Sequence, residues 1–260
     1  MITSRKNPRI QWIKRLQNNS KQRHTEGVFV IEGVRLIEEA STANWEISEV
    51  YYTDIITDRG KNLVEFLRRS NSKLEIVSTD VMQIISDTKS PQGILAVLPM
   101  KSLPLPVPLD NVLILDGLRD PGNLGTILRT AAAAKVQLAI LTAGSVDLYS
   151  PKVLRAAMGA HFSIPIVNLG WNEIKNKLDK FGLHIYLAKS TGESTYFDAD
   201  FRQPLALIIG GEAEGASEQA LGITNTSVMI PMPGGGESLN AAVAAGILLF
   251  EITRQRGYLE

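Results

Sequence analysis

The chain of 260 residues has no cysteine, and aromatic residues make up only 6% of it. Without cysteine there is no disulfide bond, no thiolate metal ligand and no thiol nucleophile, and the composition fits a reducing compartment. Three histidines are present, His24, His161 and His184, and they lie too far apart in sequence to match a metal-ligand spacing. The sequence therefore offers no metal site built from cysteine or histidine.

Long apolar runs are also missing. None approaches the roughly 20 residues that a membrane-spanning helix needs, and the N-terminus lacks the apolar core of a signal peptide. The hydrophobic content of 44% and the charged content of 21% are typical of a soluble globular protein. The sequence therefore predicts a cytoplasmic protein with no membrane partner, built as one large or two modest domains.

Three common enzyme fingerprints are absent as well. No G-x-G-x-x-G follows the first strand of either expected domain, which disfavours a nucleotide-binding oxidoreductase. The chain contains no G-x-x-x-x-G-K-[ST] for a nucleoside triphosphate and no G-x-S-x-G for a hydrolase. The chemistry has to be sought in other motifs.

The net charge of zero hides an uneven distribution. Seven of the 27 basic residues lie within residues 1–25, where there is no acidic residue, so the rest of the chain carries an acidic excess. A basic segment on an acidic body favours a polyanionic partner, although a solvated terminal helix has the same charge pattern. The side chains that we expect to contact such a partner are Arg5, Lys6, Arg9, Lys14 and Arg15.

Helical and strand periodicities alternate through residues 1–98, which predicts a small α/β sandwich domain. The expected helices are 8–16, 33–43, 61–70 and 81–85, and the expected strands are 28–31, 46–53, 74–77 and 93–98. Four prolines then crowd residues 99–109, and such a density is typical of a semi-rigid linker.

A second alternation occupies residues 110–260. Its expected strands are 112–115, 138–141, 164–167, 184–188, 205–209 and 228–230, and its expected helices are 123–134, 152–158, 173–180 and 238–254. The strands are short and mostly apolar on both faces, as in a parallel sheet that helices cover. The predicted fold class is therefore α/β, a small N-terminal sandwich followed by a parallel-sheet domain.

Two glycine-rich loops interrupt the second alternation. In residues 229–245, MIPMPGGGESLNAAVAA, a short strand is stopped by prolines, and three glycines precede a helix for which Ser238 is the expected N-cap. In residues 204–215, PLALIIGGEAEG, another strand runs into glycines beside Glu212 and Glu214. One such loop is a common strand-to-helix connection, but two of them favour a ligand site with helix amides directed at it.

A third motif is the turn at residues 120–129, DPGNLGTILR. We expect Asn123 to cap the helix that follows, and Gly125 to allow close approach of a ligand or another backbone. Arg129 follows nearly two turns later, so we expect Asn123 and Arg129 to face roughly the same side. That pair suits a phosphate and a hydroxyl on one substrate, although an exposed helix arginine is the simpler interpretation.

These motifs resemble those of the SpoU (TrmH-type) RNA 2′-O-ribose methyltransferases of the knotted methyltransferase superfamily. LDGLRDPGNLGTILRTAAA at residues 115–133, LIIGGEAEG at 207–215 and IPMPGGGESLNAAVAAG at 230–246 match in order and spacing. SPKVLRAAMGAHFSIPI at residues 150–166 is similar to the middle segment of the family. The family often has Asn or Ser in place of Gly211, Ser in place of Ala157, and Val-Ser in place of Ala241 and Ala242.

The resemblance implies a particular architecture. RKNPRIQWIKRL and VFVIEGVRLIEEA are similar to the RNA substrate-binding domain that often precedes the core and looks like an L30e-type ribosomal protein. The C-terminal domain would thread into a trefoil knot, form a homodimer and bind S-adenosylmethionine without a metal ion. The residues that would line the donor pocket are Gly210, Gly211, Ile230, Met232 and Leu239.

The resemblance also implies catalytic roles. Arg129 is the catalytic residue by analogy, but a guanidinium stays protonated, so we expect it to grip the RNA phosphate and stabilise the developing alkoxide. Asn123 and Asn240 would position the hydroxyl and the ribose. Ser238 would fix the loop, and Glu212 would orient Arg129 or the loop amides. The expected substrate is ribosomal RNA, with transfer RNA as second choice. The alternatives are a catalytically silent RNA-binding protein and an RNA base methyltransferase.

Overall fold

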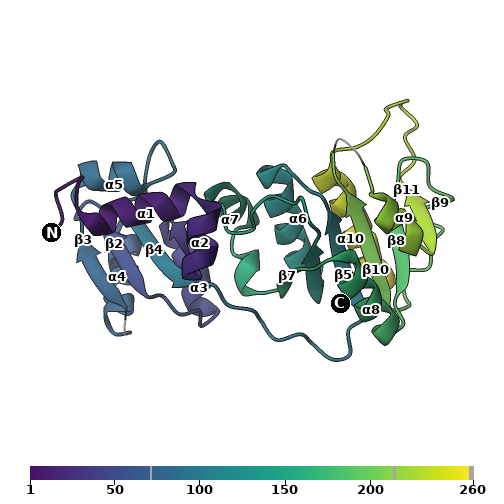
Figure 1. Ribbon diagram of the computed structural model, residues 1–260, viewed down its shortest axis with the longest axis horizontal. Coiled ribbons are helices and arrows are strands. Elements are labelled where there is room, and N and C mark those ends of the chain that lie inside the picture. The colour runs from purple at the N-terminus through teal and green to yellow at the C-terminus, as the bar shows by residue number, and fades with distance from the viewer. Residues whose placement is uncertain (71, 213–214, 258–260) are drawn as a thin grey trace. The chain divides into compact units, whose positions relative to one another are not determined.

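The computed structural model describes residues 1–70, 72–212 and 215–257, and the chain divides into two compact units. Unit 1 consists of Met1–Lys101 together with Asp147–Phe162, and unit 2 consists of Ser102–Val146 together with Ser163–Glu260. Both units are built from helices and strands in alternation, as the sequence predicts (Figure 1).

Unit 1 is built around a four-stranded sheet in the described residues, with the order β1-β4-β2-β3. Strand β4 pairs antiparallel with β1 and β2, whereas β2 and β3 are parallel. Its elements are α1 (Pro8–Asn18), α2 (Ser20–Glu26), β1 (Val28–Glu32), α3 (Val34–Thr42), β2 (Glu49–Tyr52), α4 (Asp58–Arg68), β3 (Lys73–Ile76), α5 (Thr79–Ile85), β4 (Ile94–Pro99), α7 (Pro151–Ala157) and the 3-10 turn η1 (Ala160–Phe162).

Helices α1 and α5 form the core of unit 1 with the sheet. Ile10, Ile13 and Leu16 repeat at helical spacing along α1 and are fully buried in one cluster with residues of α5 and the strands. Helix α2 lacks such a stripe, because its sequence SKQRHTE is polar throughout and its buried residue is Arg23. The apolar periodicity that predicts α1 therefore gives no sign of α2.

Unit 2 contains a seven-stranded sheet in the described residues, with the order β7-β6-β5-β10-β8-β11-β9 and every neighbouring pair parallel. Strands β5 and β10 are buried almost along their whole length, which accounts for their continuous apolar sequences. The elements are β5 (Asn111–Asp116), α6 (Pro121–Ala133), β6 (Leu138–Leu141), β7 (Ile166–Asn168), α8 (Trp171–Phe181), β8 (His184–Ala188), β9 (Ser194–Thr195), β10 (Leu205–Gly210), α9 (Glu218–Ile223), β11 (Thr226–Met229) and α10 (Ala241–Gln255).

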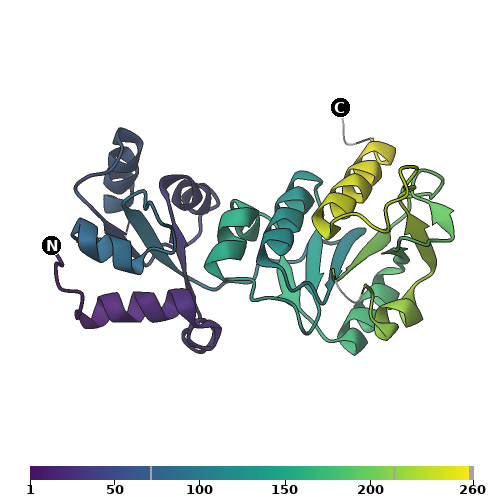
Figure 2. The same ribbon diagram turned by 90° about the horizontal axis from the view of Figure 1, so that it is seen from above.

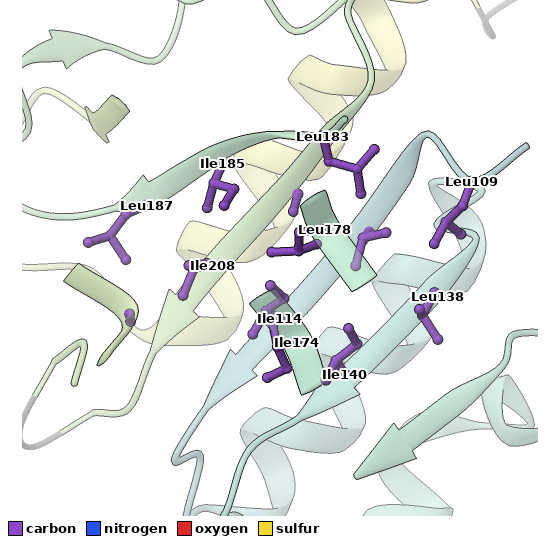
Figure 3. Close-up of a cluster of buried hydrophobic side chains, with 13 residues drawn as sticks. Leu109, Ile114, Leu138, Ile140, Ile174, Leu178, Leu183, Ile185, Leu187 and Ile208 are labelled. Atoms are coloured by element: carbon purple, nitrogen blue, oxygen red, sulfur yellow. The ribbon is translucent and has the colours of Figure 1, made fainter. Parts of the chain in front are cut away.

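Helices cover both faces of this sheet. Its register places Ile114 beside Ile140 and Ile208, and these side chains pack against Ile174 and Leu178 of α8 (Figure 3). Helices α6 and α10 lie next to each other on the opposite face (Figure 2). The parallel-sheet class predicted from the sequence is confirmed.

Several boundaries differ from the prediction. Helices α2 and α9 and the short strand β9 were not predicted. Helix α6 begins at Pro121 because Asp120, and not Asn123, is its N-cap. Helix α10 begins at Ala241 because Asn240, and not Ser238, caps it. Residues 100–110 have no helix or strand, as expected of a proline-rich linker.

Residues 147–162, which the sequence places in the second domain, belong to unit 1. The carboxylate of Asp147 accepts hydrogen bonds from Arg23, whose side chain is only 5% exposed. The Arg23 guanidinium also donates to the backbone oxygen of Gln17 at 3.0 Å. Burial alone would raise the pKa of Asp147, but the hydrogen bonds and charge of Arg23 outweigh it and hold the pKa below its usual value. The rings of Tyr149 and Phe29, 4.7 Å apart, add an apolar contact.

The side chain of His161, which belongs to this segment, is buried. Its Nε2 is 2.9 Å from the backbone oxygen of Leu148, and its Nδ1 has no partner among the described residues. Burial lowers the pKa of His161 from 6.5 to about 4. Because the folded pKa lies below the unfolded one, the unfolded chain binds more protons between these two pH values. This group therefore makes the fold less stable as the pH falls from about 6.5 to about 4.

We predict that His161 lowers the free energy of unfolding by about 2 kcal/mol between pH 7 and pH 5. In His161→Gln this part of the pH dependence should vanish, because an amide can still donate to Leu148 but has no proton to gain. Urea denaturation of both proteins at the two pH values measures the difference. An equal loss of stability on acidification in the variant and the wild type would contradict the assignment.

Candidate active site

A cavity of about 690 Å³ lies in unit 2, at the carboxyl ends of β8, β10 and β11. Ligand sites of parallel α/β sheets form at this edge, and the volume suits a small organic ligand. The predicted residues that line it are Gly210, Gly211, Glu212, Ile230, Met232, Ser238, Leu239 and Asn240. Two segments far apart in sequence, both glycine-rich, therefore form one cavity.

The first wall is the loop that follows β10. Gly211 and Gly215 exchange backbone hydrogen bonds of 3.0 and 3.1 Å, so the chain doubles back on itself. A Cβ at Gly210 would lie 2.5 Å from the backbone carbon of Gly215, a distance that no side chain tolerates. The loop thus brings backbone groups to the cavity where side chains would fill it. Glu214, the second carboxylate of the sequence motif, lies outside the described residues.

The second wall is formed by residues 230–240 and the start of α10. Asn240 caps this helix, since its Oδ1 accepts from the backbone nitrogens of Ala242 at 2.9 Å and Val243 at 3.3 Å. Ser238 is an exposed loop residue that lines the cavity. Ala241 and Ala244 line it from the first turns of the helix. Their small side chains leave the space next to the helix N-terminus open.

Three predicted side chains, here called the Asn-Glu-Asn cluster, form a hydrogen-bonded row at the cavity. Their order along the row is Asn240, Asn123, Glu212. The Nδ2 of Asn240 donates to Oδ1 of Asn123 at 3.0 Å, and the Nδ2 of Asn123 donates to Oε1 of Glu212 at 2.8 Å. The helix amides occupy Oδ1 of Asn240, which fixes the orientation of each amide in turn. All three side chains reach solvent, so the cluster can bind a hydroxyl-bearing substrate.

Arg129 takes no part in the hydrogen bonds of this cluster. It is exposed on α6, is not among the cavity-lining residues, and has no ion pair within the described part of the chain. A helix turns by about 100° per residue, so six residues leave Arg129 about 120° away from Asn123. Ideal helix geometry does not place the two side chains on one side, and their shared action on a substrate stays a prediction. Glu212, expected to orient Arg129 or the loop amides, is hydrogen-bonded to Asn123 instead.

The basic N-terminal side chains separate into two groups. Arg9 is partly buried and has its partners within unit 1. Its Nε donates to Glu49 at 2.8 Å, and its guanidinium stacks 3.7 Å from the ring of Trp12. Arg5 forms an exposed pair with Asp80 at 3.5 Å. By contrast, three of the five predicted contact residues are exposed and have no ion pair in the described residues: Lys6, Lys14 and Arg15.

The cavity has further lining residues that sequence reasoning missed. Lys189 and Ser190 follow the carboxyl end of β8, and Ala216 and Leu221 belong to the loop after β10 and to α9. The signal for Lys189 was available, because residues just after a parallel strand face the binding edge. No such signal exists for Leu221, since α9 itself was not expected.

The described residues contain neither a metal-binding cluster nor a membrane span. No three His, Asp or Glu side chains lie together in a way that would hold a metal ion. No described helix combines the length and the apolar character needed to cross a bilayer.

Two family models match this chain. The SpoU rRNA Methylase family matches residues 110–250, which include both cavity walls and Asn123. The MRM3-like substrate binding domain matches residues 7–96, which lie within unit 1. Together they span most of the chain, and their junction falls in the proline-rich linker.

Similar proteins carry the same two parts. An uncharacterized tRNA/rRNA methyltransferase of Synechocystis is 35% identical over 98% of this chain and 94% of its own length. The 23S rRNA (guanosine(2553)-2′-O)-methyltransferase RlmP of Bacillus subtilis is 32% identical over 96% of this chain and 98% of its own. The crystal structure of the SpoU methyltransferase AviRb of Streptomyces viridochromogenes with AdoMet superimposes with a TM-score of 0.89 at 29% identity, covering 96% of this chain and 98% of that one. The chain thus belongs to the SpoU rRNA methylase family.

Proposed function

We propose that this protein transfers a methyl group from S-adenosylmethionine to a ribose 2′-hydroxyl of ribosomal RNA. The observation that carries the proposal is the Asn-Glu-Asn cluster at the edge of a glycine-walled cavity of about 690 Å³. The family and the named activity of the Bacillus subtilis relative, a 23S rRNA 2′-O-methyltransferase, support the same reaction and substrate class.

The cavity fits the methyl donor. Gly210 and Gly211 bring backbone groups to its wall, which suits the hydrogen-bonding edges of an adenosine. Ile230, Met232 and Leu239 supply apolar surface for the flat adenine ring. When bound, S-adenosylmethionine supplies a methyl group already activated by the sulfonium, so the reaction is a single displacement that needs no metal ion.

The polar residues then act on the ribose. The Asn-Glu-Asn cluster holds the sugar by hydrogen bonds, with Asn123 and Asn240 positioning the hydroxyl and the ribose and Glu212 accepting at the end of the row. Ser238 fixes the loop that carries Asn240. Arg129, an unpaired exposed guanidinium in the described structure, holds the RNA phosphate and stabilises the alkoxide as the hydroxyl releases its proton to the phosphate or to water.

A knotted chain and a homodimer complete the proposal. A close approach of two chain segments at Gly192 supports the knot. A Cβ at Gly192 would lie 2.6 Å from the nitrogen of Met229. The exposed face of α10 supports the dimer. Val243 and Phe250, seven residues apart, are 51% and 46% exposed on a helix whose residues 241–250 are all apolar.

We predict that Arg129→Ala reduces methyl transfer by at least about 10²-fold, the scale of removing one preorganised electrostatic group. Affinity for S-adenosylhomocysteine should stay unchanged, because Arg129 does not line the cavity. Single-turnover assays on ribosomal RNA, followed by nucleoside digestion and mass spectrometry, measure both rate and product. Arg202→Ala is the control, since Arg202 is exposed before the amino end of β10. A base-methylated product would overturn the proposed function, and normal turnover of Arg129→Ala would overturn the role of this residue.

A second prediction concerns RNA binding by unit 1. Deleting residues 1–98 is not a clean test, because residues 147–162 would lose their partners. We therefore choose Lys14→Glu with Arg15→Glu, which should weaken RNA binding and lower its salt slope by up to about 0.7 per lost phosphate contact.

The matched control for this pair is Arg68→Glu with Arg69→Glu, two adjacent exposed arginines at the end of α4. It changes the net charge equally at another place in unit 1. Filter binding at several salt concentrations compares the two variants. Equal effects on affinity and slope would mean that only net charge counts and that α1 does not hold RNA.

For the dimer, we predict that Phe250→Asp yields monomers, because a charge in an apolar interface costs more than the interface can offset. Phe66→Asp is the control, since Phe66 is 60% exposed on α4 of unit 1. Sedimentation velocity distinguishes the states. Dimers that persist in Phe250→Asp would place the interface elsewhere.

A further inference from the structure

A buried carboxylate behind the glycine loop has no place in the roles above. Asp116 is the last residue of β5, is 5% exposed and does not line the cavity. It has no ion pair within the described residues. Its two oxygens are instead bound separately: Oδ1 accepts from Oγ1 of Thr142 at 3.0 Å, and Oδ2 accepts from the backbone nitrogen of Ser217 at 2.7 Å.

The bonds of Thr142 fix the chain beyond β5. Its hydroxyl donates to Asp116 and accepts from the backbone nitrogen of Gly117 at 3.0 Å. The direction of each hydrogen bond is therefore set, because the amide can only donate and the carboxylate can only accept. As a result, residues 116 and 117 are held against the end of β6 next to the glycine loop.

The bond to Ser217 holds the far end of that loop. Ser217 also caps α9, where its Oγ accepts from the nitrogen of Ala220 at 3.2 Å. The residues just before it, Gly215 and Ala216, line the cavity. The first residue of the loop, Gly211, lies close to Gly117, since a Cβ at Gly211 would be 2.9 Å from the backbone oxygen of Gly117. Ser217 is thus hydrogen-bonded to Asp116, and Gly211 lies closely against Gly117.

The chemistry of Asp116 indicates a positional role. Burying a carboxylate without a cation is costly, and two hydrogen bonds satisfy it only in this geometry. A charge-assisted bond from an amide to a carboxylate is shorter and stronger than one between neutral groups. Such a bond restrains a loop that has three glycines, at residues 210, 211 and 215, and little conformational preference of its own.

We infer that Asp116 is a positioning residue of the donor site, which holds residues 211–212 and 215–217 in the shape of the cavity wall without touching the ligand. The inference rests on the proposed function, because it takes the cavity as the site of S-adenosylmethionine. Glu212 belongs to the same loop, so the position of the Asn-Glu-Asn cluster also depends on Asp116.

The test compares three variants by calorimetric titration with S-adenosylhomocysteine. Asp116→Ala should raise Kd at least about tenfold, since a hydrogen bond to a charged group contributes that much to an equilibrium. Asp116→Asn should bind almost as well as the wild type. Its carbonyl oxygen can accept from Ser217, while its amide faces Oγ1 of Thr142, whose hydrogen turns to the oxygen of Ala143 at 3.4 Å.

Gln137→Ala is the matched control. The Gln137 side chain pins the other end of β5, where its Oε1 accepts from the nitrogens of Asp110 at 2.7 Å and Asn111 at 3.1 Å. This variant should lower the thermal unfolding temperature and leave the affinity for S-adenosylhomocysteine unchanged. A loss of affinity equal to that of Asp116→Ala would mean that the site responds to general destabilisation only.

The remaining outcomes separate the two proposals. A wild-type protein that does not bind S-adenosylhomocysteine would overturn the proposed function. Wild-type affinity in folded Asp116→Ala would overturn the positioning role alone. Should Asp116→Ala fail to fold, Thr142→Val replaces it, because it removes only the hydroxyl between Asp116 and Gly117. That variant should bind S-adenosylhomocysteine several-fold more weakly, and unchanged affinity would again overturn the role of Asp116.

Discussion

The close approach of two backbone segments at the carboxyl end of β10 is the constraint on which the site depends. With only 2.5 Å between a Cβ at Gly210 and the carbon of Gly215, no residue but glycine fits there. The loop can therefore double back, and the cavity gains walls of backbone and small side chains. Such a loop has no stiffness of its own. Its shape has to come from its surroundings, and Asp116 supplies part of this restraint from outside the cavity, through its hydrogen bond to the backbone of Ser217.

The polar part of the site depends on a helix end in the same way. The first amides of α10 have no partner within the helix, and Oδ1 of Asn240 satisfies two of them. With Oδ1 of Asn240 facing the helix, its Nδ2 points to Asn123 and donates to Oδ1 of that residue. The Nδ2 of Asn123 in turn donates to Glu212. A requirement of helix capping thereby orients three side chains that come from three segments of the sequence.

The sequence predicts those parts of the structure that local pattern determines. Continuous apolar runs predict β5 and β10, and prolines followed by glycines predict the loops of the cavity. It fails where a distant partner decides. Ser238 and Asn240 are both residue types that favour the N-cap position. In the structure Asn240 caps α10, and it is also the residue that donates a hydrogen bond to the distant Asn123. Arg9 and Arg23 look like members of a basic arm, yet Glu49 and Asp147 bind them, 40 and 124 residues further on.

Contacts between residues far apart in sequence also determine where the chain passes from one unit to the other. The backbone nitrogen of Val146 donates to Leu118 at 2.8 Å, two residues beyond Asp116, so the chain is still held within unit 2 there. The next residue, Asp147, is fixed in unit 1 by Arg23. Residues 147–162 then bury the apolar side of α7 in unit 1 before the chain returns at Ser163. A segment within the residues that match the SpoU rRNA Methylase family therefore completes the fold of unit 1, and neither unit is a contiguous piece of the sequence.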